Sequence, residues 1–162
     1  MEKVKREFNV PWITKEGYFD PSKFPIDGVL KQALSKDFGK FHSGCNMLQT
    51  MHQHGRAEAG IYLLGLLRHY QNDIERAMVV VEKLSGFHTA ECADALFSEL
   101  FRVKSSNTTR KYLNSIIKVL SYFPKEIVQE RFHELAEEKS FSYKMRRKFR
   151  DIIKMTYYRS FD

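Results

Sequence analysis

Apolar residues recur along the chain at intervals of three and four residues from about residue 26 onward, and short polar segments interrupt them. These intervals place the apolar side chains on one face of an α-helix, and the two-residue alternation typical of strands is absent. The pattern therefore predicts an all-α chain of eight helices in two alternating series. The first helices of each pair are expected at 26–36, 56–70, 89–103 and 125–138, and the second helices at 38–53, 74–85, 108–122 and 142–157.

The second helices share one apolar pattern when the chain is compared with itself at a shift of about 36 residues. VEKLSGF, at 81–87, matches IKVLSYF, at 117–123, and each aligned set has the spacing i, i+3, i+4, i+7 of a single helix face. Gly44 and Thr156 are the poorest matches. The aligned sets are Phe41, Gly44, Cys45, Leu48; Ala77, Val80, Val81, Leu84; Leu113, Ile116, Ile117, Leu120; and Phe149, Ile152, Ile153, Thr156.

The first helices also align, at a shift of about 34 residues. Leu63, Leu64 and Leu67 fall on Phe97, Ser98 and Phe101 one unit later. One helix pair cannot bury its apolar face alone, so repeated pairs are expected to stack on their neighbours. The pattern predicts an α-α superhelix, or solenoid, of about four stacked antiparallel helix pairs. The alternative is a non-repeating bundle of eight helices whose amphipathic patterns match by chance.

The segment DIERAMVVVEKL, at 73–84, is similar to the second helix of a HEAT unit. It has an Asp in the turn, then Arg-Ala, then an apolar stripe that ends in Leu. Over roughly 26–158 the chain resembles the HEAT and armadillo class of α-solenoid, although Thr109 and Met145 replace the Asp in the third and fourth units. The resemblance implies that the second helices line a concave face where partners bind, and it carries over no functional residue.

A polar stripe on the last two second helices is the candidate binding site. Its positions point away from the apolar face of each helix, and stacking would place Lys111 near Arg147 and Lys118 near Lys154. Residues 101–162 contain fifteen Lys or Arg against seven Asp or Glu, whereas residues 51–100 contain four against seven. The stripe consists of Lys111, Asn114, Lys118, Arg147, Arg150 and Lys154.

The basic stripe suggests an anionic partner, and the net charge of +7 permits one without requiring it. The expected function is a non-enzymatic adaptor or scaffold that holds a partner protein, through an acidic surface or peptide, on its concave face. The alternative is a solenoid that binds nucleic acid, with Lys and Arg on the phosphates and tyrosines near the C-terminus on exposed bases. A third reading is that these cations only form the solvated face of a terminal helix.

Catalytic and metal-binding patterns are missing from the sequence, so no enzyme, cofactor or metal is expected. His52 and His54 are two residues apart, which directs them to different sides of a helix. Cys45 and Cys92 lie among apolar residues at helical spacing, so both are expected to be buried thiols. The longest apolar run, at 60–67, is too short for a membrane span, and a soluble cytoplasmic protein is expected.

Residues 1–25 differ from the rest of the chain in being rich in aromatic residues and proline. They are expected to form an N-terminal arm or cap in front of a helical repeat domain at 26–162. A cap would cover the exposed core at the first helix pair, as solenoids require. The alternative is an arm that docks on a partner through Trp12, Tyr18, Phe19 and Phe24.

Overall fold

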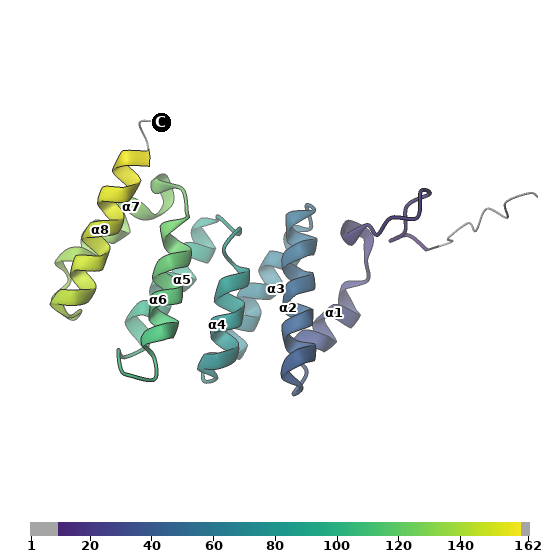
Figure 1. Cartoon of the computed structure of the whole chain (residues 1–162), viewed down its shortest axis with the longest axis horizontal. Helices are drawn as coiled ribbons and strands as arrows, with labels where there is room; N and C mark the ends of the chain where they lie inside the picture. Colours follow the sequence, from purple (N-terminus) through teal and green to yellow (C-terminus); the bar gives the residue numbers. More distant parts are fainter. Residues whose placement is uncertain (1–9, 160–162) are drawn as a thin grey trace, which may run out of the picture. The chain divides into compact units, whose positions relative to one another are not determined.

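The computed structural model describes residues 10–159, and the side chains of residues 10–155. Within this range the protein is all-α, and the eight predicted helices are confirmed with ends within three residues of those expected (Figure 1). A short 3-10 helix, η1 (Pro21–Lys23), precedes them. The α-helices are α1 (Ile26–Ala33), α2 (Phe38–Gln53), α3 (Ala57–His69), α4 (Ile74–Lys83), α5 (Ala90–Arg102), α6 (Arg110–Ser121), α7 (Lys125–Glu137) and α8 (Tyr143–Arg159).

Polar side chains at the helix starts explain where several helices begin. The first backbone N–H groups of a helix have no partner within it, and a side-chain oxygen just before the helix can accept from them. Asp37 accepts from the backbone of Lys40 at 2.8 Å, and Asp73 accepts from that of Arg76 at 3.1 Å. Thr89 does the same at the start of α5.

The chain divides into two compact units, at 1–86 and 87–162. In the first unit α2 packs against α1, α3 and α4. In the second unit α5 packs against α6 and α7, and α7 packs against α8, so contacts run mainly between consecutive helices. Figure 1 shows α6 and α8 in front of α5 and α7. None of the helices in the described part of the chain is long and apolar enough to cross a membrane.

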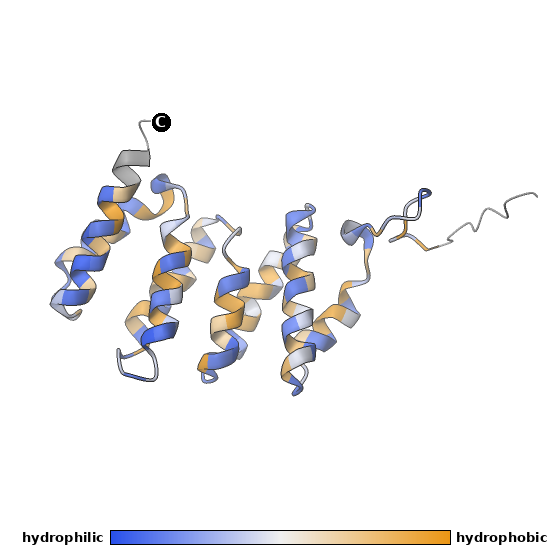
Figure 2. Ribbon diagram, in the orientation of Figure 1, coloured by the Kyte–Doolittle hydropathy of each residue, from blue (hydrophilic) through white to orange (hydrophobic). Residues whose placement is uncertain are grey.

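The aligned apolar positions of the second helices form much of the core. Phe41, Ala77, Leu113 and Phe149 occupy the same position in the four helices, and all four are buried. Of the last set, Ile152 is buried and Ile153 is half-buried, while the side chain of Thr156 lies outside the described residues. In Figure 2 hydrophobic and hydrophilic residues occur together on the same helices, and the coloured residues of α8 are mostly hydrophilic. The apolar pattern of the second helices therefore predicts their core face well.

Phe101 departs from the predicted apolar face of the first helices. It is 55% exposed, whereas Leu96, Phe97 and Leu100 on the same helix are buried. Its ring lies 5.1 Å from that of Phe141, measured between centroids, in the turn before α8. The core face of α5 is thus rotated relative to the face expected from the repeat.

Gly44, a poor match to the repeat, lies where the backbones of α1 and α2 approach closely. A Cβ at Gly44 would lie 2.4 Å from the backbone nitrogen of Ala33 and 2.8 Å from its Cα. Only a residue without a side chain permits this approach. Gly44 therefore departs from the apolar pattern of the repeat because the close packing of α1 against α2 requires glycine at this position.

Arg76 joins three helices of the first unit. It is the Arg of the HEAT-like segment, and its guanidinium donates to the carbonyl groups of Ser35 and Lys36 just after α1. The same group lies over the rings of Phe41 and Tyr70, at 4.7 and 5.5 Å from the centroids. Arg76 therefore binds the end of α1 to a cluster of aromatic side chains.

Local contacts hold together the described part of the N-terminal arm. Ile13 and Phe19 form an isolated antiparallel bridge, and Phe24 packs edge-on against Trp12 and Phe19. Arg56, at the start of α3, donates a hydrogen bond to the carbonyl of Phe24. The arm is therefore attached to the first unit, and its role as a cap or a docking arm stays a prediction.

Candidate functional site

Charge is separated between the first and second helices of the second unit. The sequences of α6 and α8 contain ten Lys or Arg and one acid, Asp151. Those of α5 and α7 contain three Lys or Arg against seven Asp or Glu. In the first unit, α2 and α4 together carry three Lys or Arg against two Glu. The large excess of positive charge on second helices is therefore confined to the second unit. We call α6 and α8 the basic helices.

Two of the three cations of α5 and α7, Arg102 and Arg131, are paired with nearby acids. Arg131 contacts Asp94 at 2.6 Å, which links α7 to α5. Arg102 forms a forked pair with Glu99 through Nε at 2.8 Å and Nη2 at 2.7 Å. Tyr112 of α6 donates a 2.5 Å hydrogen bond to the same carboxylate. These groups stabilise the packing of the unit and leave its first helices with few unpaired cations.

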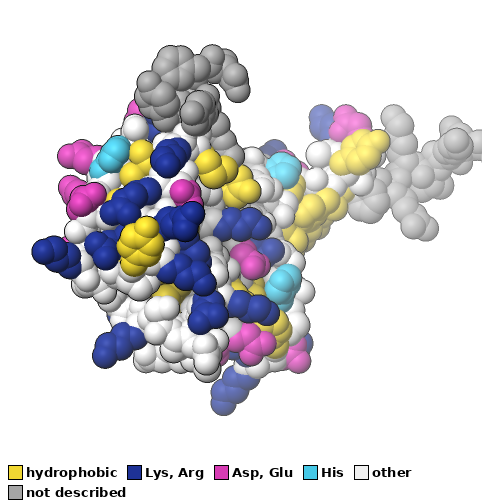
Figure 3. All heavy atoms as spheres, turned by 60° about the vertical axis from the view of Figure 1, so that its left-hand side comes forward, with side chains coloured by type: hydrophobic (Ala, Val, Ile, Leu, Met, Phe, Trp, Pro, Cys, Tyr) yellow, Lys and Arg dark blue, Asp and Glu magenta, His cyan; other side chains and the backbone are white. Residues whose placement is uncertain are grey.

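Four cations of the predicted stripe are exposed, and we call them the cationic quartet: Lys111, Lys118, Arg147 and Lys154. Among the residues that the structure describes, none of the ion pairs includes a member of this quartet. Figure 3 shows Lys and Arg side chains gathered on the side of the second unit that faces the viewer. Their charges are therefore available to an external anion.

Asn114, the uncharged member of the stripe, connects the two basic helices. Its side-chain oxygen accepts a 2.7 Å hydrogen bond from the Nζ of Lys148. Lys148 was not among the predicted site residues, because the repeat aligns Asn114 with Arg150 instead. A contact between α6 and α8 depends on which sides of the two helices face each other, and the repeat alignment does not specify this.

Arg150 extends toward α7, unlike the cationic quartet. Its Nη2 donates a 3.2 Å hydrogen bond to the carbonyl of Ala136 and lies 3.9 Å from a carboxylate oxygen of Glu137. The carbonyl of Ala136 is one of the last four of α7, which lack partners within the helix. Arg150 therefore caps α7.

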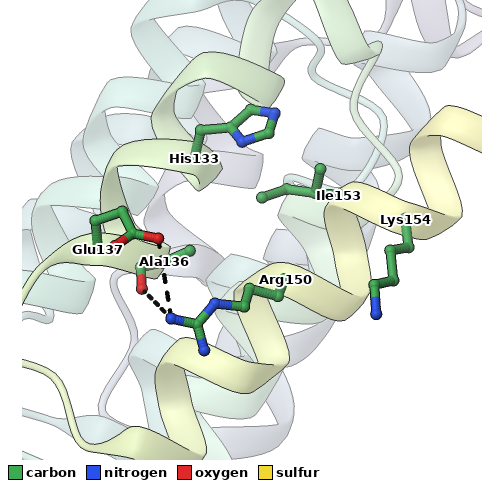
Figure 4. Close-up of a pocket in the computed structure, with 6 residues that line it drawn as sticks. All are labelled: His133, Ala136, Glu137, Arg150, Ile153 and Lys154. Carbon is green, nitrogen blue, oxygen red and sulfur yellow. Dashed lines mark hydrogen bonds and ion pairs between the residues drawn. The ribbon is translucent and has the colours of Figure 1, made fainter.

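An open hollow of about 390 Å³ lies between α7 and α8 (Figure 4). Its exposed lining is mostly apolar, and Ile153 points from α8 toward α7. Arg150 and Lys154 are the members of the predicted stripe that line the hollow. The residues that line it are His133, Ala136, Glu137, Arg150, Ile153 and Lys154.

The described residues contain no group of three or more His, Cys, Asp or Glu arranged to hold a metal ion.

Cys45 and Cys92 are fully buried, and burial raises the pKa of each thiol to about 12. A thiol that stays protonated is a poor nucleophile. His54 donates a hydrogen bond from Nδ1 to the carbonyl of Thr50, 2.8 Å away, near the end of α2.

The chain was compared with protein-family models, curated proteins and solved structures, and no significant match was found. Its function is therefore inferred from its own residues.

Proposed function

We propose that this protein is a non-enzymatic adaptor that holds an acidic segment of a partner protein on the exposed face of its basic helices, α6 and α8. The observation that carries the proposal is the separation of charge within the second unit. Ten Lys or Arg against one Asp lie on the basic helices, while acids outnumber cations on α5 and α7.

This arrangement differs from an ordinary charged surface. Soluble proteins usually mix both signs of charge over their surfaces, which limits repulsion between neighbouring like charges. The members of the cationic quartet have no ion-pair partner among the described residues, so this excess of positive charge is not relieved within that part of the chain. An acidic partner would relieve it, and complementary charge also accelerates association and selects the partner.

The helix pairs of each unit are, in this proposal, repeats of the α-solenoid type. The support is that Phe41, Ala77, Leu113 and Phe149 are buried at equivalent positions of four second helices. Repeats with a common phase would present their second helices on one shared face, and extended concave faces of this kind bind partners in repeat proteins.

Nucleic acid is a second candidate partner, and one observation favours it. Tyr143 lies one turn before Arg147 on α8, and it is 67% exposed. An exposed aromatic ring beside cations could stack on an unpaired base while the cations contact phosphates.

Fluorescence anisotropy with labelled probes would test the proposal and separate the two partners. A Glu-rich peptide, a Gln-rich peptide of equal length and a single-stranded oligonucleotide are the three probes. We expect the Glu-rich peptide to bind, with affinity that falls as salt is raised, and the Gln-rich peptide not to bind. Tighter binding of the oligonucleotide, with a steep loss between about 50 and 200 mM salt, would replace the acidic partner with nucleic acid. Absence of binding to every anionic probe would contradict the proposal.

A further inference from the structure

We infer that the hollow between α7 and α8 receives one apolar side chain of the acidic partner, as an anchor flanked by that partner's carboxylates. The inference rests on the proposed function and adds the chemistry of the segment: an acidic stretch with a large apolar residue within it. Binding energy in protein interfaces is concentrated in such buried anchors, while surrounding charges contribute less.

The floor of the hollow supplies an apolar surface. Ile153 of α8 is half-buried and directed toward α7 (Figure 4), and it supplies most of this surface because Ala136 of α7, which also lines the hollow, is already buried. The hollow has a volume of about 390 Å³ and is open to solvent. An aromatic or leucine side chain would remove this apolar floor from water, and burial of apolar area is favourable.

The α8 side of the hollow supplies positive charge. Arg150 and Lys154 are four residues apart, so they lie on one side of the helix, one turn from each other. Lys154 also belongs to the cationic quartet, which continues along α8 to Arg147. A segment anchored in the hollow would therefore place carboxylates next to its anchor within reach of these cations.

Arg150 is held in position before any partner arrives. Its hydrogen bond to the carbonyl of Ala136 uses one of its nitrogens, and a guanidinium has five N–H donors in a planar fork. The donors that remain can bind a carboxylate, and less side-chain entropy is lost because the group is already ordered.

Glu137 stands on the α7 side of the hollow and carries the opposite charge. Its side chain is 81% exposed, and its closest carboxylate oxygen is 3.9 Å from Arg150, which is at the outer limit of an ion pair. An exposed carboxylate in this position can turn toward solvent when a partner binds. It also disfavours an acidic residue at the anchor position itself, which agrees with an apolar anchor.

The test compares two Glu-rich peptides that differ in one central residue, Phe in one and Ser in the other. Anisotropy titrations of the full chain measure both. We expect the Phe peptide to bind about tenfold more tightly, as expected for one buried anchor. The protein is unchanged in this comparison, so its folding does not affect the outcome.

Two substitutions locate the anchor on the protein. Ile153→Ala removes part of the floor and should abolish most of the difference between the two peptides. Met155→Ala is the matched control, because Met155 is an exposed apolar residue of the same helix that does not line the hollow. It should leave the difference unchanged.

The outcomes separate this inference from the proposed function. Equal, salt-sensitive binding of both peptides would overturn the anchor and leave the acidic partner in place. A preference for Phe that Ile153→Ala does not reduce would also overturn the anchor site, because the ring would then lie elsewhere. Failure of both peptides to bind would overturn the proposed function and the inference together.

Discussion

At the scale of single residues, two glycines have opposite roles in the first unit. Gly44→Ala should destabilise the protein by about 1–3 kcal/mol or more, because its Cβ would overlap the backbone of Ala33 and backbone atoms cannot move aside cheaply. Gly65→Ala, in α3, should stabilise by up to about 1 kcal/mol, since open space surrounds that position and Ala favours the helix. Urea unfolding of both variants would measure the change. Equal effects of the same sign would contradict the close approach of α1 and α2.

The buried pair of Tyr112 and Glu99 gives a second prediction at this scale. Tyr112→Phe removes the donor of a 2.5 Å hydrogen bond to a charged carboxylate, so a loss of about 1.5–3 kcal/mol in unfolding free energy is expected. Burial, and then the hydrogen bond to Glu99, raises the pKa of Tyr112, so the hydroxyl stays protonated and remains a donor at neutral pH.

Tyr143→Phe is the matched control for this substitution. Tyr143 is exposed on α8, and its hydroxyl should contribute less than about 0.5 kcal/mol. Similar unfolding free energies for Tyr112→Phe and the parent chain would show that the bond between α5 and α6 contributes no net stability.

At the scale of elements, Arg76 is expected to hold α1 against α4. Arg76→Ala removes two hydrogen bonds to carbonyl groups beyond α1 and the contacts of the guanidinium with aromatic rings. The expected loss is about 2–4 kcal/mol, and hydrogen exchange should rise in α1 before the rest of the unit. Arg68→Ala is the control, because Arg68 is an exposed arginine of α3. Unchanged exchange in α1 would refute this role.

The helices themselves were predictable because each has an apolar face with clear ends. Asp37, Asp73 and Thr89 are N-cap residues of types that favour helix starts, and each accepts a backbone hydrogen bond in the structure. The face of α5 was predicted less well, since Phe101 matches an apolar position of the repeat but lies exposed. A matched residue type does not specify how far one helix is rotated against the next.

At the scale of the whole molecule, the sequence indicated the basic stripe but not all of its contacts. The alternation of apolar and charged positions was sufficient to predict that Lys111, Lys118, Arg147 and Lys154 are exposed. The contact of Asn114 with Lys148 and the hollow lined by Arg150 were not predicted, because both depend on the packing of one helix against another. The separation of charge between first and second helices needed only the helix bounds, and the sequence could have revealed it.

The excess of positive charge on the basic helices is the central feature of the proposed function. The most direct test measures the affinity of two double charge-reversal variants for a Glu-rich peptide and compares each with the parent chain. Lys118→Glu with Lys154→Glu changes the basic helices, whereas Lys31→Glu with Arg68→Glu makes the same change in net charge on α1 and α3 of the first unit. We expect the first pair to weaken binding by about a hundredfold or more, and the second pair to weaken it by less than about threefold. Equal losses in the two variants would show that net charge alone drives binding, and would contradict a binding face on α6 and α8.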